Sequence, residues 1–272
     1  IERLHHRLGQ PLVVLVDEYD KPILDVLEVP ELARQVRGRL RRLYAVIKLC
    51  AAHIRFTFLT GVSKFSKVSI FSGLNNLNDI TLDLAYSAIC GYTDGDIDTV
   101  FAPELPGLDR EEIRRWYNGY NWGGEAVYNP FDLLLLFRKR EFRTYWFETG
   151  TPTFLVNLLA RERVFTPDLE SLLSSEALLS KFDVDRIAPE ALLFQTGYLT
   201  ISSRQTGLKG QTTYRLGYPN QEVALSLNEA LLSAYGVPER PLLQASETLP
   251  LLLQTTDFEG LQGLLQSLLA SI

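Results

Sequence analysis

Apolar residues follow two different periods along the first third of the chain. Residues 12–16 are consecutive apolar residues, a pattern typical of a strand buried on both faces of a parallel sheet. Residues 31–52 carry apolar side chains three or four positions apart, which predicts a long amphipathic helix. Residues 55–60 alternate and are rich in strand-forming residues, so they predict a second core strand. The strand–helix–strand order indicates an α/β fold with a parallel sheet over residues 1–92.

The pattern becomes mainly helical beyond residue 92. Asp109 and Asn129 each stand where a helix is expected to begin, and Pro130 suits a first helical position. Helices are predicted at residues 109–117, 131–138, 146–159, 168–180, 189–194, 220–235 and 251–269, strands at 197–203 and 212–216, and a linker at 238–250. Helices followed by a β-hairpin are typical of a winged helix.

Composition narrows the class of protein without identifying it. The chain is 46% apolar and 22% charged, as expected for a globular protein. Its net charge of −6 argues against nucleic-acid binding over the entire surface. The apolar runs are too short to cross a membrane, so we expect no membrane contact. Two isolated cysteines, Cys50 and Cys90, fit a reducing cytosol, and we expect a cytoplasmic protein. His5, His6 and His53 show no zinc-binding pattern.

The first predicted strand ends in two adjacent carboxylates, Asp17 and Glu18. Open α/β sheets bind their ligands beyond the carboxyl ends of the strands. An Asp–Glu pair in this position has the form of a Walker B motif, in which the first carboxylate holds Mg²⁺ and the second orients the attacking water. The alternative is an ordinary exit of a strand into a loop.

Polar residues also follow the second predicted strand. In Walker-type ATPases the strand after Walker B ends in a polar sensor of the nucleotide, and Thr60, Ser63 and Lys64 are candidates for it. The alternative is that Gly61 makes a turn and Ser63 caps the segment that follows. The sequence leaves both interpretations open.

The motif that normally accompanies Walker B does not occur in this chain. No Gly-x-x-x-x-Gly-Lys-Ser/Thr phosphate-binding loop lies among its residues, and it contains no methionine. In many P-loop proteins this loop lies well upstream of Walker B. We therefore expect the chain to be a fragment that lacks its N-terminal portion, and to bind ATP poorly by itself.

Five segments together resemble the AAA-ATPase-like family of bacterial and archaeal proteins. They are residues 14–22, residues 60–79, residues 117–120 with 128–130, residues 145–146 with 149–150, and residues 195–200 with 219–223. The resemblance implies a P-loop ATPase core related to the AAA and STAND classes, then a helical lid and a winged-helix-like region. Members commonly carry a PD-(D/E)XK nuclease-like domain at the C-terminus, which this chain does not contain.

The resemblance implies specific roles for a few residues. It assigns Mg²⁺ binding to Asp17 and the catalytic base to Glu18, with ATP and Mg²⁺ as cofactors, and it places Thr60, Ser63 and Lys64 in the sensor region. Tyr120, Asn121 and Asn129 match the family without an assigned chemical role. The implied domains are the end of the ATPase core (1–92), the lid (93–165), a winged-helix-like region (166–240), and a linker with a helix (241–272).

Two further interpretations remain open. The ATPase core could be degenerate, leaving a winged-helix module that binds DNA or protein, with Arg204, Lys209 and Arg215 as its phosphate contacts. Alternatively, the ATP state could gate an attached nuclease-like domain, an idea that depends on the family resemblance alone. A homo-oligomer is compatible with either interpretation.

Overall fold

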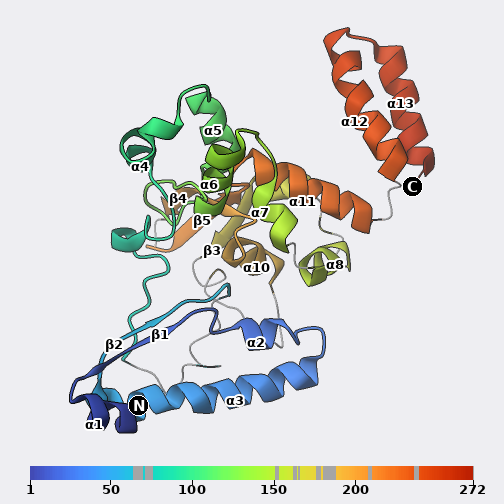
Figure 1. Cartoon of the computed structure of the whole chain (residues 1–272). Coiled ribbons are helices and arrows are strands. Elements are labelled where there is room, and N and C mark those ends of the chain that lie inside the picture. Colours follow the sequence, from blue (N-terminus) through green and yellow to red (C-terminus); the bar gives the residue numbers. More distant parts are fainter. Residues whose placement is uncertain are drawn as a thin grey trace.

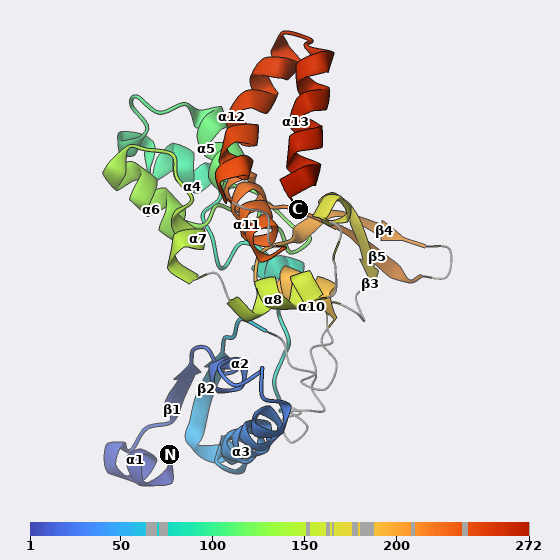
Figure 2. The ribbon, with the colours of Figure 1, turned by 90° about the vertical axis from the view of Figure 1, so that its right-hand side faces the viewer.

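The computed structural model forms a lower unit, an upper unit and a helical hairpin that projects from the upper unit (Figure 1 and Figure 2). The structure describes residues 1–63, 70, 76–150, 153–161, 164, 166–175, 179, 188–207, 210–235 and 239–271. None of the helices in these ranges is long and apolar enough to cross a membrane. The fold is mixed α/β, with a small parallel sheet and many helices.

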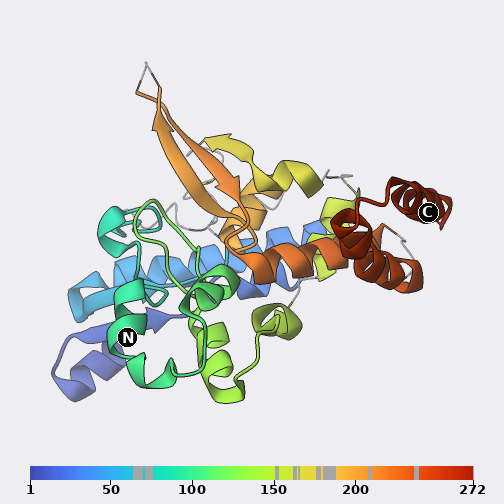
Figure 3. The ribbon, with the colours of Figure 1, turned by 90° about the horizontal axis from the view of Figure 1, so that it is seen from above.

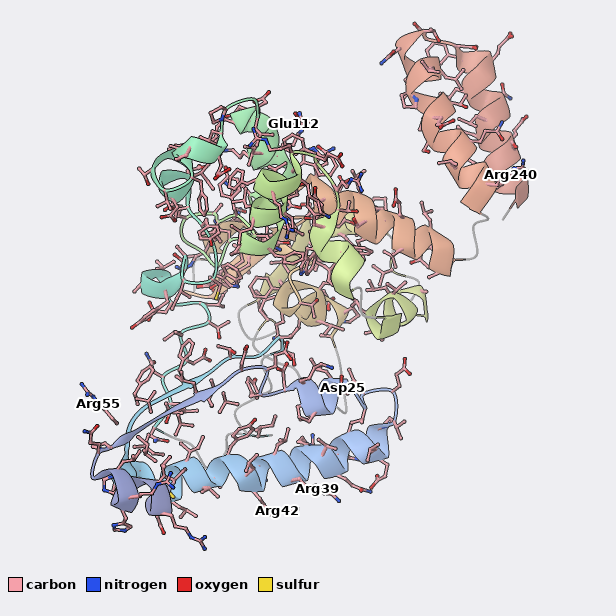
Figure 4. All side chains as sticks on the ribbon, viewed as in Figure 1. Asp25, Arg39, Arg42, Arg55, Glu112 and Arg240 are labelled. Carbon is pink, nitrogen blue, oxygen red and sulfur yellow. The ribbon has the colours of Figure 1, made fainter. Side chains whose placement is uncertain are left out.

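The lower unit has the predicted strand–helix–strand order. Its elements are α1 (Glu2–Leu8), β1 (Leu12–Val16), α2 (Lys21–Leu24), α3 (Pro30–Leu49), the 3₁₀ turn η1 (Ala51–His53) and β2 (Ile54–Leu59). β1 and β2 are parallel, with Val14 opposite Thr57. Arg39 and Arg42 project from the side of α3 that faces away from the sheet (Figure 4), as expected for a solvated helix face.

The expectation that β1 is buried on both faces is wrong. Val13 and Leu15 are 56% and 69% exposed, whereas Val14 and Val16 pack into the core with Leu40 of α3. The cause is that the described residues cover only one face of the two-stranded sheet. Consecutive apolar residues in β1 therefore supply one packed face and one apolar face open to solvent.

The chain from residue 84 to residue 161 contains a second core, formed by buried side chains between residues 97 and 145, while Leu155 and Leu159 pack in the same core as Leu40. The elements are η2 (Leu84–Tyr86), α4 (Asp94–Thr99), η3 (Ala102–Glu104), α5 (Arg110–Tyr117), α6 (Pro130–Lys139), α7 (Tyr145–Gly150) and α8 (Thr153–Arg161). Asp109 accepts a hydrogen bond from the Glu111 N–H at 2.9 Å, and Asn129 accepts one from the Phe131 N–H at 2.9 Å. Both predicted N-caps are therefore confirmed, and they fix where α5 and α6 begin.

A three-stranded antiparallel sheet follows, with the order β3-β5-β4. Its elements are η4 (Thr166–Glu170), β3 (Leu172–Ser175), α10 (Pro189–Gln195), β4 (Thr200–Thr206) and β5 (Thr212–Gly217). The predicted hairpin is confirmed as β4–β5 and projects from the body of the molecule (Figure 3). The prediction of a helix over residues 168–180 is wrong in its described part, because residues 172–175 pair with β5 as a strand instead.

The C-terminal helices differ from the prediction in their boundaries. They are α11 (Gln221–Ala234), α12 (Glu239–Gln254) and α13 (Phe258–Ser271). The predicted linker at 238–250 is wrong, because α12 runs through it and contains Pro250. The predicted single helix at 251–269 is also wrong, because Thr256 adopts a left-handed φ of 55° that ends α12 and allows α13 to fold back on it. The apolar pattern of the sequence does not show where α12 ends and α13 begins.

Gly119 joins the second core to the start of α11 and leaves no room for a side chain. Its φ is +123°, and an added Cβ would lie 1.8 Å from the Pro219 carbonyl oxygen. We predict that Gly119→Ala lowers the free energy of unfolding by at least about 2 kcal/mol, measured by urea denaturation. Gly38→Ala is the matched control, because a Cβ there meets nothing within 4 Å and should raise stability by about 1 kcal/mol within α3. Equal effects of the two substitutions would contradict the prediction.

Candidate functional site at the ends of the parallel strands

The two parallel strands stay hydrogen-bonded beyond their last residues. The Thr60 N–H donates to the Val16 carbonyl at 2.8 Å, and the Tyr19 N–H donates to the Thr60 carbonyl at 2.9 Å. These bonds place residues 17–20, which follow β1, beside residues 60–63, which follow β2. The two polar segments predicted from the sequence therefore meet at one edge of the sheet.

Asp17 lies at the centre of this edge. Its Oδ1 atom accepts hydrogen bonds from the Glu18 N–H at 3.0 Å and from the Thr60 hydroxyl. The Asp17 side chain is nevertheless exposed, and no described residue binds its Oδ2 atom. One oxygen thus holds the carboxylate in place while the other is available to a ligand.

Glu18 has a left-handed backbone conformation, with a φ of 50°. Residues other than glycine adopt this region at a cost of roughly 1–2 kcal/mol. The turn directs Tyr19 and Asp20 into the core, where both are buried, and leaves Asp17 and Glu18 exposed. Strain of this kind is found more often at functional sites than elsewhere.

Asp20 is a fully buried carboxylate that binds the segment after β2. Oδ1 accepts the Val62 N–H at 3.1 Å, and Oδ2 accepts the Ser63 N–H at 2.5 Å and the Ser63 hydroxyl at 2.6 Å. These three donors satisfy the buried carboxylate. Asp20 therefore joins the two segments that carry the candidate site.

Gly61 and two tyrosines complete this connection. A Cβ on Gly61 would lie 2.6 Å from Asp20 Oδ1, so only glycine allows the segment to approach so closely. The Tyr19 hydroxyl donates to the Ser63 carbonyl at 2.8 Å, and the Tyr44 hydroxyl of α3 donates to the Tyr19 carbonyl at 3.2 Å. Burial, and after it the charge of Asp20, raises the pKa of the Tyr44 phenol. The site is thus anchored to the long helix of the lower unit.

The structure brings together some of the predicted site residues and separates others. The structure places Thr60, which is partly exposed, beside the exposed Asp17 and Glu18. Ser63 is instead 1% exposed, and its hydroxyl donates a hydrogen bond to Asp20. Lys64 lies outside the described residues. The geometry gives Ser63 a supporting position beneath the site.

The residues that match the family without an assigned role lie in the upper unit. Asn129 caps α6, Tyr120 is buried, and Asn121 Oδ1 accepts the Gly123 N–H at 2.5 Å in a tight turn. Each has a structural explanation, so none needs a chemical one.

Asp20 is the residue of this site that the sequence interpretation missed. It belongs to the same acidic run as Asp17 and Glu18, and the Gly61–Ser63 segment was already identified as polar. What distinguishes Asp20 from its neighbours is its burial, which depends on the left-handed turn at Glu18. Glycine is the residue that usually marks a left-handed turn, and position 18 is a glutamate, so the sequence gives no sign of this turn.

A groove of about 630 Å³ runs along the open edge of β2. Consecutive residues of β2, from Arg55 to Leu59, line it on one side, and residues 76–81 line it on the other. Consecutive residues of a strand point to opposite faces, so a groove that touches all of them follows the strand edge. In the described part of the chain, β1 is the strand that pairs with β2.

Magnesium needs few protein ligands at a site of this kind. No group of three or more His, Cys, Asp or Glu among the described residues is arranged to hold a metal ion. Nucleotide-bound Mg²⁺ is usually held by one or two carboxylates together with waters and substrate phosphates. The anchored Asp17 carboxylate, with one exposed oxygen, fits that requirement.

Comparison with known proteins identifies the family of the segment that carries this site. A family model of the AAA-ATPase-like family, described as a predicted AAA-ATPase, matches residues 1–71. These residues hold β1, β2 and the candidate site, and the predicted resemblance to the AAA-ATPase-like family is confirmed over them.

The chain is also similar over its whole length to a curated relative. An uncharacterized protein in the vnfD 5′ region of Azotobacter chroococcum mcd 1 is 62% identical over 272 residues, which are 100% of this chain and 52% of that protein. The chain spans about half the length of this relative. No solved structure matches the chain.

The Asp20 connection can be tested by stability. We predict that Asp20→Ala lowers the free energy of unfolding by about 3–5 kcal/mol, because it leaves the two buried donors of Ser63 and the partly buried Val62 N–H without an acceptor. Asp25→Ala is the control: Asp25 directly follows α2 (Figure 4) and forms an exposed ion pair with Lys21, so its removal should cost less than about 1 kcal/mol. Urea denaturation of both variants checks the prediction, and a small loss in Asp20→Ala would contradict it.

The strain at Glu18 predicts an unusual effect of glycine. Glu18→Gly should be more stable than Glu18→Ala by about 1 kcal/mol, because alanine keeps the cost of the left-handed conformation and glycine does not. Thermal denaturation of the two variants at one pH checks this difference. If Glu18→Ala proved as stable as Glu18→Gly, the turn would carry no strain.

Proposed function

We propose that Asp17 and Glu18 form the Mg²⁺ and water site of an ATPase, within a protein longer than these 272 residues. The observation that carries the proposal is the Asp17 carboxylate, anchored through Oδ1 by Thr60 and the Glu18 N–H at the end of a parallel strand, with Oδ2 exposed. The family of residues 1–71 supports the same assignment.

Each residue of the site has a distinct role in this proposal. Asp17 holds Mg²⁺, which would neutralise charge on the transferred phosphoryl group. Glu18, exposed beside Asp17, accepts a proton from the attacking water as the general base. Thr60 joins the two strand ends through its bond to Asp17, so a change in the metal site would be transmitted to the segment after β2.

ATP binding by this site needs a phosphate-binding loop that the chain itself does not contain. The groove along the open edge of β2 supports an additional strand at this position, since a strand edge presents backbone donors and acceptors for pairing. A strand seated there would end at the same edge of the sheet as Asp17. We therefore propose that residues outside this chain supply the loop.

The partners of the whole protein follow from the family and remain proposals. They are ATP, a C-terminal PD-(D/E)XK nuclease-like domain gated by the ATP state, further copies of the same protein in a homo-oligomer, and nucleic acid. The alternative of a degenerate ATPase that binds DNA through its β4–β5 hairpin depends on a few basic residues. Arg215 donates a hydrogen bond to the Ser171 hydroxyl, and Lys209 lies outside the described residues. Arg204 alone is thin support for that alternative.

The decisive experiment uses the whole open reading frame that contains this chain. In that protein, Glu18→Gln should reduce ATP hydrolysis by about 10²–10⁴-fold and retain ATP binding, because the amide keeps the shape of the side chain and cannot accept the proton. Turnover is measured by phosphate release, and binding by equilibrium titration with a fluorescent ATP analogue.

An exposed glutamate elsewhere in the lower unit provides the control. Glu28→Gln should leave hydrolysis unchanged, since Glu28 is not part of the site. Unchanged turnover in Glu18→Gln would remove Glu18 from the role of base. Failure of the whole protein to bind ATP would favour the degenerate core.

A further inference from the structure

Two acidic side chains are completely buried where α6 meets α11. Asp132 lies in the first turn of α6 and Glu222 in the first turn of α11, and each is 0% exposed. Their carboxyl groups lie beside each other at the start of α7 (Tyr145–Gly150), which packs against both helices, although the two residues are far apart in the sequence. Burial of two neighbouring carboxylates, both ionised, would be strongly unfavourable.

The hydrogen bonds of Asp132 in the described part of the chain do not suit an ionised carboxylate. Glu222 Oε1 accepts the Trp146 N–H at 2.8 Å, at the start of α7. Among the described residues, no N–H or O–H group has hydrogen-bond geometry to either oxygen of Asp132, because the nearby Trp146 N–H donates to Glu222 instead. Ionised carboxylates only accept hydrogen bonds, so two of them side by side can bind each other only when one carries a proton.

Two tyrosines also lie beside the pair. The phenol groups of Tyr117 of α5 and Tyr120 lie near both carboxyl groups, and Tyr120 also lies near the Asn129 and Asn220 amides. Among the described residues, no Lys or Arg side chain acts on the Asp132 carboxyl group. Burial raises the pKa of Tyr117 and of Tyr120, so these phenols stay neutral. A cation therefore does not compensate the Asp132 charge.

We propose that Asp132 and Glu222 share one proton, and that this proton locks α6 and α7 to the start of α11. The shared proton thus holds α6 and α7 of the second core against α11, the helix that follows the antiparallel sheet. Loss of the proton places two like charges in contact within the core, which drives the helices apart. This inference is independent of the ATPase proposal.

The pKa of the pair supports the same conclusion. Burial, then the hydrogen bond and charge of Glu222, raise the pKa of Asp132 from 3.8 to about 9, and the Trp146 N–H acts in the opposite direction. The unfolded chain releases this proton near pH 4, whereas the folded protein keeps it up to about pH 9. Within that window the folded state binds one proton more, so the stabilising effect is full below pH 4 and is lost as the pH rises.

The test follows the unfolding equilibrium of the 272-residue chain from pH 5 to pH 8. One retained proton makes the unfolding constant rise about tenfold per pH unit from this pair alone. Asp132→Asn removes that proton, and its amide can still donate to Glu222. The ratio of the wild-type unfolding constant to that of Asp132→Asn should therefore rise by about tenfold per pH unit. Glu222→Gln should remove the same dependence, because its amide lets Asp132 ionise.

The controls separate a shared proton from other causes. Glu125→Gln changes an exposed glutamate and should leave the wild-type pH dependence unchanged. Parallel curves for the wild type and Asp132→Asn would overturn the proposal. Loss of the dependence in Asp132→Asn but not in Glu222→Gln would overturn the sharing, because Asp132 would then keep its proton through burial alone.

A second measurement keeps the test decisive if the variants do not fold. The infrared spectrum of the wild type at pH 7 should contain the carbonyl band of a protonated carboxylic acid, and unfolding at that pH should remove it. Absence of the band in the folded wild type would overturn the proposal without any substitution.

Discussion

The buried carboxylate of Asp20 is the interaction on which the candidate site depends. Parallel strands β1 and β2 bring two chain segments to one edge of the sheet, but parallel pairing alone does not fix the loops that follow. Asp20 fixes them by accepting both backbone N–H groups and the hydroxyl of the Val62–Ser63 segment. Since Gly61 admits no side chain at this contact, the arrangement constrains the sequence on both sides.

The turn at Glu18 explains how neighbouring acidic residues reach opposite environments. An extended continuation of β1 would alternate its side chains between two faces. The left-handed residue instead keeps Asp17 and Glu18 together in solvent and sends the next two residues into the core. The three hydrogen bonds of Asp20 and the packing of Tyr19 on Tyr44 offset the conformational cost. Exposure of the candidate site is thus stabilised from beneath.

Sequence reasoning succeeded where the signal is local. The strand–helix–strand unit, the N-caps Asp109 and Asn129 and the β4–β5 hairpin each depend on residues close together in the chain. It failed where long-range pairing decides the outcome. Residues 172–175 form a strand because β5 lies beside them, and α12 passes through Pro250 because α13 packs against it. The prediction that β1 is buried on both faces of the sheet failed because a run of consecutive apolar residues does not show how many faces of the sheet are covered.

Of the candidate site, the sequence could predict Asp17, Glu18 and Thr60 but not the residue that holds them. Asp20 and Asp132 are both fully buried aspartates, and the residues next to them in the sequence do not indicate which one is ionised. The difference lies in their hydrogen bonds. Asp20 accepts three, which suits an ionised carboxylate, whereas in the described part of the chain neither oxygen of Asp132 accepts one, which suits a neutral acid. Two buried aspartates therefore join distant segments by different means. Asp20 accepts hydrogen bonds in the lower unit, and Asp132 keeps a proton in the upper unit.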